Sequence, residues 1–271
     1  MRSKSMPEAY HSDLDPQERA LHYGDGLFET LLRYEGKIPR WQAHYMRLGR
    51  GCERLSIALP EEAWLRQRVE QQAGKAANAV IKIIVSRGRG GRGLHLPEDA
   101  RPSVLVFSYP WTPVQTDGLR VALCQTPLPI NPTLAGLKHL NRLDYVLAAL
   151  ELQNRTGIDE GIVCDSEGYL VEGLISNLFF MTRGRVYTPS LEFAGVAGIM
   201  RLEVLEQLRR NGIEIEIGRF PAELLLGASE CFLCNSVRGV LPIAAIDGQT
   251  FDVGETTRSL MRTLNIPAIN L

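Results

Sequence analysis

A turn-rich stretch near the middle of the chain, YPWTPVQTDG at 109–118, constrains the fold most strongly. It contains two prolines and a glycine, and its apolar residues follow neither a helical nor a strand period. Such a stretch interrupts regular structure, and 271 residues suffice for one large domain or two smaller ones. We therefore predict an N-terminal α+β domain over 1–110, a linker over 111–119 and a C-terminal domain over 120–271.

The N-terminal part mixes strand and helix patterns. Residues 26–36 predict a strand that ends at a turn. Bulky and apolar residues recur at helical spacing over 40–57, and a second helix over 60–76 has proline and acids in its first turn. Two runs rich in β-branched residues, 79–88 and 101–110, predict further strands. This order is typical of an α+β fold.

The C-terminal part predicts a sheet with few helices. Hairpins are expected around DSEG and TRGR, and helices over 141–154 and 198–212, the second closed by Asn-Gly. Further strands are expected in LRVALCQTPL, IEIEIGRF, ASECFLCNSV and VLPIAAIDG.

Charge and hydropathy narrow the class of protein. A formal net charge of −1 gives no reason to expect nucleic acid or anionic lipid as a partner. There is no long uncharged apolar run, so we expect no membrane-spanning helix. The polar start, MRSKSMPEAYHSDLDPQE, lacks the apolar centre of a secretion signal. A cytoplasmic protein is the expectation.

The five cysteines predict no metal site. The pair in CFLC has the spacing of metal ligands, but no second pair completes such a site. The surrounding residues indicate a buried strand, in which Cys231 and Cys234 would point to opposite faces. We expect reduced, structural cysteines.

Lys138 is the first candidate for chemistry. It follows a tightly shaped backbone, Asn-Pro and then Gly136, and it is surrounded by leucines just ahead of a helix. Apolar surroundings lower the pKa of a lysine, and the neutral amine can form a Schiff base with an aldehyde such as pyridoxal phosphate. The alternative is a surface lysine whose stem covers apolar residues.

Such a cofactor would need further groups. Its phosphate requires a cation and free amides, for which Arg47 and the helix start at Gly198, with the amides of Ile199 and Met200, are candidates. Its pyridine nitrogen requires a carboxylate, and Glu172 lies in an otherwise apolar stretch. Each candidate has an ordinary structural alternative: Arg47 as a surface arginine, Gly198 as a helix cap and Glu172 as a glutamate on an edge strand.

Seven sequence blocks, taken together, resemble the fold-type IV pyridoxal-phosphate enzymes. The blocks, in chain order, are HYGDGLFET, HYMRLGRGCERL, VSRGRGGRG, LAGLKHLNRLD, DSEGYLVEGLISNLFF, AGVAGIMR and CNSVRGVLPI. The resemblance runs from about Asp15 to the last residues. It implies a two-domain fold with a smaller N-terminal α/β sandwich and a larger C-terminal β-barrel-like α/β domain. It also implies pyridoxal 5'-phosphate as cofactor and a homodimer whose site lies at the domain cleft, lined partly by the neighbouring subunit.

The resemblance also implies roles for individual residues. Lys138 would join the cofactor and act in catalysis with Thr30, and Glu172 would hold the pyridine nitrogen. The phosphate would be bound by Arg47, the amides of Ile199 and Met200, and the turn at Asn235 and Ser236, while Asn177 would line the site.

Within the family, the blocks are most similar to the 4-amino-4-deoxychorismate lyases, especially in GLKHLNRLD, SRGRGGRG and AGVAGIMR. That branch converts a small dicarboxylate to 4-aminobenzoate and pyruvate for folate biosynthesis. Two departures stand out. Glu29 precedes Thr30, where many such lyases have a second threonine and aminotransferases often have glutamate. The family's usual first strand is replaced by MRSKSMPEAYH, so that strand is missing or altered. A branched-chain or D-amino-acid aminotransferase remains the alternative.

The run SRGRGGRGLH at 86–95 is a candidate substrate-binding loop. Arginine matches the geometry of carboxylates, and glycines allow the backbone to approach a ligand closely. Arg92 is our first choice, with Arg87 and Arg89 as further candidates. The alternatives are a solvated loop or an RNA-binding segment, and the single short run and the net charge of −1 argue against RNA.

Overall fold

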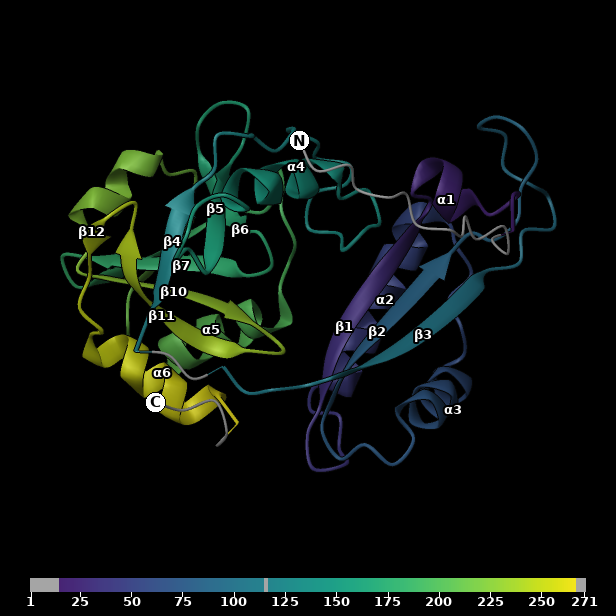
Figure 1. Cartoon of the computed structure of the whole chain (residues 1–271), viewed down its shortest axis with the longest axis horizontal. Helices are drawn as coiled ribbons and strands as arrows, with labels where there is room; N and C mark the ends of the chain where they lie inside the picture. The colour runs from purple at the N-terminus through teal and green to yellow at the C-terminus, as the bar shows by residue number, and fades with distance from the viewer. Residues whose placement is uncertain (1–14, 115–116, 267–271) are drawn as a thin grey trace, which may run out of the picture.

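The computed structural model describes residues 15–114 and 117–266. These residues form two β-sheets with helices packed on them, one sheet from each half of the chain (Figure 1). The first described helix, α1 (Arg19–Tyr23), precedes the smaller sheet. The predicted alteration of the first family strand concerns residues that lie outside the described ranges.

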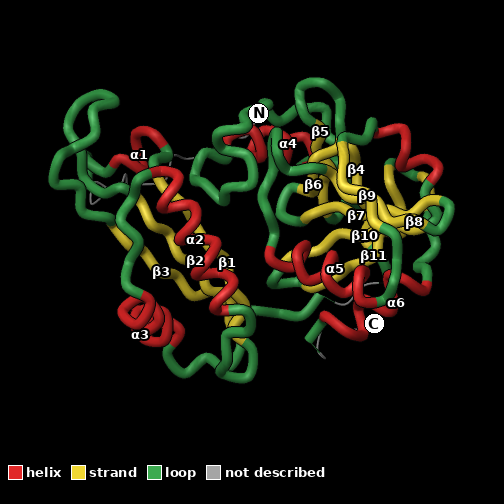
Figure 2. Tube along the Cα trace, turned by 180° about the vertical axis from the view of Figure 1, so that it is seen from behind, coloured by secondary structure: helices red, strands yellow, loops and turns green. Residues whose placement is uncertain are grey.

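The smaller sheet has three antiparallel strands in the order β1 (Gly26–Arg33), β2 (Ala79–Ser86) and β3 (Ser103–Pro110). Two helices, α2 (Trp41–Leu55) and α3 (Glu62–Ala73), pack on one face (Figure 2). Successive side chains of a strand point to opposite faces. Leu31, Ile81 and Ile83 therefore join the core under the helices, and the residues between them face the other way.

The larger sheet has nine strands among the described residues, in the order β6-β5-β4-β11-β10-β7-β8-β9, with β12 paired to β11. The pairs β4–β5, β4–β11 and β8–β9 are parallel and the rest are antiparallel. The strands are β4 (Leu119–Leu123), β5 (Glu160–Cys164), β6 (Leu170–Gly173), β7 (Asn177–Thr182), β8 (Arg185–Pro189), β9 (Ile215–Gly218), β10 (Glu230–Asn235), β11 (Gly239–Ile246) and β12 (Gln249–Thr250).

Both faces of this sheet are apolar. On one face, α5 (Ile199–Arg210) and α6 (Glu255–Leu264) cover the stacked rings of Phe179 and Phe232. On the other, Phe180 packs against Tyr187 and Phe220. The 3-10 helix η1 (Ala222–Gly227) adds to that second cluster, and α4 (Leu143–Leu152) packs on β5.

The fold-class prediction is confirmed by the two sheets and by solved structures of the same architecture. The expected helix over 141–154 begins at Leu143 and ends at Leu152, while α1, α6, η1 and β12 were not predicted. Cys231 and Cys234 belong to separate hydrophobic clusters on opposite faces of β10, as expected. β3 ends at Pro110 and β4 begins at Leu119, but the exact domain boundaries stay a prediction. None of the described helices has the length and apolar character needed to span a membrane.

Candidate active site

A cavity of about 630 Å³ lies between the two sheets and gathers most of the predicted site residues. It is lined by β1, by the segment before α4, by the β6–β7 turn, by the start of α5 and by the β10–β11 turn. The predicted residues that line it are Thr30, Arg47, Lys138, Glu172, Asn177, Ile199, Asn235 and Ser236. The Met200 side chain is instead packed in the core under α5, which leaves only its backbone amide for the predicted contact.

Backbone hydrogen bonds on two sides fix the position of Lys138. The Phe28 amide in β1 donates to the Lys138 carbonyl (2.9 Å), which ties the segment to the smaller sheet. Two residues earlier, the Gly136 amide donates to the Gly195 carbonyl (2.9 Å), and the Ala197 amide donates back to Gly136 (3.0 Å). Gly136 has φ +78°, a conformation that favours glycine. The lysine segment therefore connects the two halves of the cavity.

The amine of Lys138 has no polar partner among the described residues. Its Nζ lies 4.2 Å from the centre of the Phe28 ring and borders the cavity. Burial, followed by the nearby charge of Arg47, lowers the pKa of Lys138 to about 8. A substantial fraction of the amine is therefore neutral near pH 8, which suits a nucleophile or a base. This geometry excludes the surface-lysine alternative.

Glu172 lies on β6 with both carboxylate oxygens bonded. Oε1 accepts a hydrogen bond from the Tyr145 hydroxyl (2.6 Å), and Oε2 accepts from Asn177 Nδ2 (2.9 Å) and the Val196 amide (3.0 Å). Burial raises its pKa. Tyr145 was not identified from the sequence as a site residue; the one sequence feature that could have suggested it is its position seven residues after Lys138. Asn177 was predicted to lie at the site, but its contacts were not predicted.

Glu29 and Thr30 are neighbours on β1 but face opposite sides. Glu29 accepts hydrogen bonds from Arg47 Nε (2.7 Å) and from His44 Nδ1 (2.7 Å), and it pairs a second time with the Arg47 guanidinium. Burial alone would raise the pKa of Glu29, but the charge and hydrogen bonds of Arg47 outweigh it and lower that pKa to about 2. Glu29 therefore anchors Arg47 from outside the cavity, whereas Thr30 lines the cavity.

The start of α5 offers an anion site. The N-cap Gly198 makes no side-chain cap, so the first amides of the helix have no partner within it. A Cβ at Gly198 would lie 1.9 Å from Asn177 Oδ1, so a larger residue does not fit without a shift. Arg47 reaches this end of the helix by donating to the Ala197 carbonyl (3.1 Å). A cation and a free helix N-terminus thus meet at one place, as a phosphate requires.

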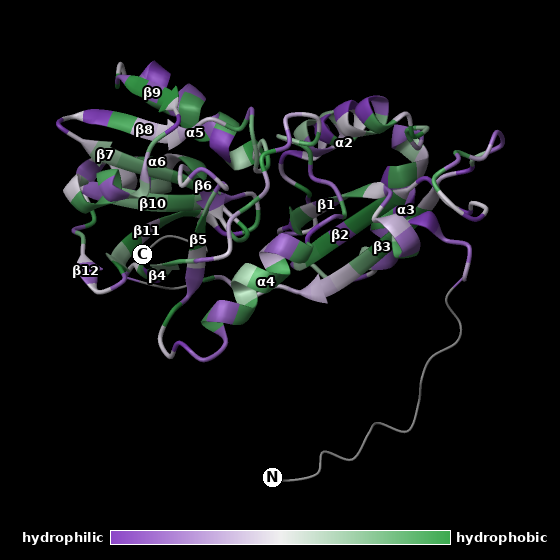
Figure 3. Cartoon of the chain, turned by 90° about the horizontal axis from the view of Figure 1, so that it is seen from above, coloured by the Kyte–Doolittle hydropathy of each residue, from purple (hydrophilic) through white to green (hydrophobic). Residues whose placement is uncertain are grey.

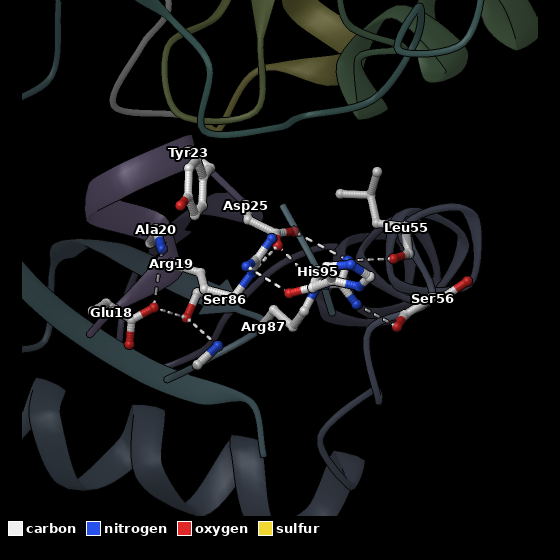
Figure 4. A network of polar contacts seen from close by, with 12 residues as sticks. Glu18, Arg19, Ala20, Tyr23, Asp25, Leu55, Ser56, Ser86, Arg87 and His95 are labelled. Carbon is white, nitrogen blue, oxygen red and sulfur yellow. Dashed lines mark hydrogen bonds and ion pairs between the residues drawn. The ribbon is translucent and has the colours of Figure 1, made fainter. Parts of the chain in front are cut away.

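Arg87 does not reach the cavity, which corrects one prediction. Its guanidinium donates to both carboxylate oxygens of Asp25 (2.8 and 3.1 Å) and to the carbonyls of Leu55 and Ser56 (Figure 4). Arg19 bonds the same carboxylate from the other side (2.8 Å). Because Arg87 is buried and four of its five N–H donors are used within the chain, it supports the loop and does not face the cavity.

The other two loop arginines also lie outside the cavity of their own chain. Arg89 pairs with Asp15 at the surface (2.8 Å), and Arg92 is exposed. The loop itself is fixed at Gly93, whose carbonyl accepts from Arg19 (3.2 Å) and whose amide donates to the Tyr23 hydroxyl (3.1 Å).

The cavity groups match pyridoxal 5'-phosphate in their chemistry. The unpaired amine of Lys138 suits its aldehyde, the Glu172 carboxylate suits its ring nitrogen, and the open start of α5 with Arg47 suits its phosphate. The fold and the site together define a pyridoxal-phosphate-dependent enzyme.

Comparison with known proteins identifies the family. The family model described as amino-transferase class IV matches residues 26–246, and the chain belongs to that family. It is 35% identical over 256 residues to an aminodeoxychorismate lyase of Vibrio harveyi, with 92% of this chain and 94% of that protein covered. It is 30% identical over 251 residues to a putative branched-chain-amino-acid aminotransferase of Methanocaldococcus jannaschii, with 90% and 87% covered.

A solved structure supports the same family. The crystal structure of 4-amino-4-deoxychorismate lyase from Pseudomonas aeruginosa superposes with a TM-score of 0.85 at 39% identity, covering 93% of this chain and 94% of that one. The predicted resemblance and the predicted cofactor are thereby confirmed at the level of the family.

Proposed function

We propose that the protein is a pyridoxal-phosphate-dependent lyase that converts 4-amino-4-deoxychorismate to 4-aminobenzoate and pyruvate, a step toward folate. Proteins named for this activity are similar to the chain in sequence and in structure. The observation that carries the proposal is the placement of Thr30 on the cavity wall, with Glu29 turned away. The glutamate that favoured an aminotransferase is a partner of Arg47 and does not line the cavity.

Lys138 and Thr30 are the proposed catalytic residues. When bound, the cofactor takes up the electrons released as the C–H bond beside the substrate's amine nitrogen breaks. Lys138 Nζ removes that proton, because its lowered pKa makes a neutral amine available. The Thr30 hydroxyl relays a proton at the neighbouring ether oxygen, where pyruvate leaves. Glu172 would keep the pyridine nitrogen of a bound cofactor protonated, and Tyr145 and Asn177 orient its carboxylate.

Arg47, the first amides of α5 and the turn at Asn235 and Ser236 are the proposed phosphate site. The Ser236 hydroxyl donates to the Thr30 carbonyl (3.2 Å), which joins this turn to β1. Asn235 holds the turn by accepting from the amides of Val237 and Arg238 (3.0 and 2.8 Å).

The reaction itself provides the first test. The holoenzyme, given 4-amino-4-deoxychorismate and no keto-acid acceptor, is expected to release pyruvate and 4-aminobenzoate in equal amounts over many turnovers. An aminotransferase would instead stop after one half-reaction per site, with the cofactor in its amine form. That result, measured by pyruvate assay and absorbance, would contradict the lyase.

We also propose a cytoplasmic homodimer. The outer face of α4 is apolar, with Leu143, Val146, Leu147 and Leu150 between 45% and 69% exposed, and Figure 3 shows this helix at the junction of the two sheets. The open face of β3 adds exposed Leu105, Phe107 and Tyr109. Such a surface is typical of a protein interface. A second copy would cover it, and we propose that Arg89 and Arg92 serve the cavity of that second copy. The five free thiols support a reducing compartment.

A charge on α4 tests the dimer. Leu147→Glu is expected to weaken dimerisation roughly 100-fold, because a carboxylate without a partner would be buried in the interface. Light scattering after size-exclusion chromatography would show a monomer at concentrations where the native chain is a dimer. The control is Leu226→Glu at an exposed position on η1, which should leave the dimer intact. Equal dimer stability in both variants would exclude α4 from the interface.

A further inference from the structure

We infer that Arg238 is a substrate-binding residue whose guanidinium takes one of the two carboxylates of the substrate. The inference rests on the proposed function and names a specificity determinant within the same cavity. It starts from the cations on the cavity wall, which among the described residues are Arg47, Lys138, Arg142 and Arg238.

Three of these cations are already engaged in contacts or assigned to the proposed reaction. Arg47 is paired with Glu29. Arg142 donates to the carbonyls of His139 (3.0 Å) and Leu137 (3.1 Å) and lies over the Tyr145 ring. The Lys138 amine is the predicted reactive group. Each of the three is therefore already assigned: Arg47 to Glu29 and the proposed phosphate site, Arg142 to the carbonyls of its own segment, and Lys138 to the proposed reaction.

Arg238 differs, because its guanidinium donates no hydrogen bond within the part of the chain that the structure describes. Its one charged contact is NH1 to Glu160 Oε2 at 3.6 Å, which is too long for a hydrogen bond, and a third of its side chain is exposed. Five N–H donors at the wall of a cavity are therefore available. A carboxylate of the substrate can accept two of them in parallel.

The residues around Arg238 hold it in place without using those donors. Its backbone amide is fixed by Asn235 Oδ1 (2.8 Å). Glu160 is buried and accepts from the Ile175 amide (3.1 Å) and the Ser176 hydroxyl (3.2 Å), so its carboxyl group is held in one position beside the guanidinium. Glu160 therefore positions Arg238, which itself lines the cavity.

The same turn separates Arg238 from the phosphate side. Ser236 bonds to Thr30 in β1, whereas Arg238 pairs with Glu160 in β5. The proposed phosphate site includes Arg47, the start of α5 and Ser236 of this turn, and Arg238 lies two residues further along, beside Glu160. The wall of the same cavity also contains Trp111, Leu174 and Ile175, which offer apolar area to a six-membered ring.

Arg238→Gln tests the inference, with Arg238→Lys as the conservative variant. For Arg238→Gln, KM for pyruvate release is expected to rise roughly 10- to 100-fold, with kcat within about threefold of the native value, since a charge-assisted contact to bound substrate is lost. Arg238→Lys should recover part of the loss. The control is Arg120→Gln, which removes the same charge from an exposed position on β4 and should change neither constant.

A second readout needs no turnover. Benzene-1,3-dicarboxylate and benzoate, titrated against the cofactor's absorbance, are expected to show a preference of the native holoenzyme for the dicarboxylate that Arg238→Gln loses. An unchanged KM and an unchanged preference would overturn the inference. Weaker cofactor binding with unchanged KM would assign Arg238 to the phosphate and overturn it too. If the native enzyme releases no pyruvate, the proposed function fails, and loss of the preference would still support a carboxylate site at Arg238.

Discussion

Lys138→Ala is expected to lower the rate of pyruvate release by about 10³-fold or more and to remove the visible absorbance of the bound cofactor. The variant loses both the amine proposed to join the cofactor and the base proposed to remove the substrate proton, so the two losses should occur together. Because the Lys138 amine has no polar partner to leave behind, the fold should stay intact. Absorbance spectra and a pyruvate assay on the purified variant provide the measurement.

Lys82 provides a matched control for this experiment. Its Nζ lies 5.3 Å from the centre of the same Phe28 ring, but Lys82 does not line the cavity. Lys82→Ala should therefore keep both absorbance and turnover. Retention of the absorbance band in Lys138→Ala, or its loss in Lys82→Ala, would show that the wrong amine has been assigned.

Glu29→Gln is expected to destabilise the protein by about 3 kcal/mol at neutral pH, because it leaves the buried guanidinium of Arg47 without its counter-charge. In the variant, the side-chain amide at this position offers one acceptor oxygen fewer to Arg47 than the carboxylate does. Because Arg47 is then less well oriented, the affinity for the cofactor should also fall. Denaturant unfolding gives the free energy, and titration with pyridoxal phosphate gives the affinity. Glu255→Gln is the control, because both side chains of its ion pair with Arg262 are exposed and the pair should contribute under about 1 kcal/mol.

The difference in unfolding free energy between the native chain and Glu29→Gln should depend on pH with a defined sign. The pKa of Glu29 is lowered from 4.5 to about 2 in the folded protein. Its stabilising contribution is therefore complete above pH 4.5 and is lost as the pH falls toward 2. The native chain and Glu29→Gln should differ most above that range and converge below it. A difference that grows on acidification would contradict the assigned ion pair.

Sequence patterns were sufficient to predict those parts of the site that depend on the local spacing of residues. The run at 26–36 predicted the strand that carries Thr30, and a glycine before an amphipathic run predicted an open helix start at Gly198. The family resemblance then brought Lys138, Arg47 and Glu172 into one site, and the cavity between the sheets contains all three.

What the sequence could not provide depends on contacts between distant segments. Arg87 looked like a free arginine in a glycine-rich loop, but it is bound to Asp25 and to the end of α2, which lie 62 and about 31 residues away. Tyr145 becomes significant only because folding brings its hydroxyl to Glu172, 27 residues along the chain. The helix α6 was missed because its apolar residues Leu260 and Met261 are few and acquire a core only by packing on α5 and β11.

The two-sided attachment of the lysine segment links cofactor chemistry to the relative placement of the sheets. Gly136 is bonded to the larger half and Lys138 to the smaller half, with one residue between them. Any hinge opening that parted the sheets would have to break one of these attachments and displace the reactive nitrogen. If Lys138 is the reactive residue, its alignment depends on the two sheets keeping their present placement.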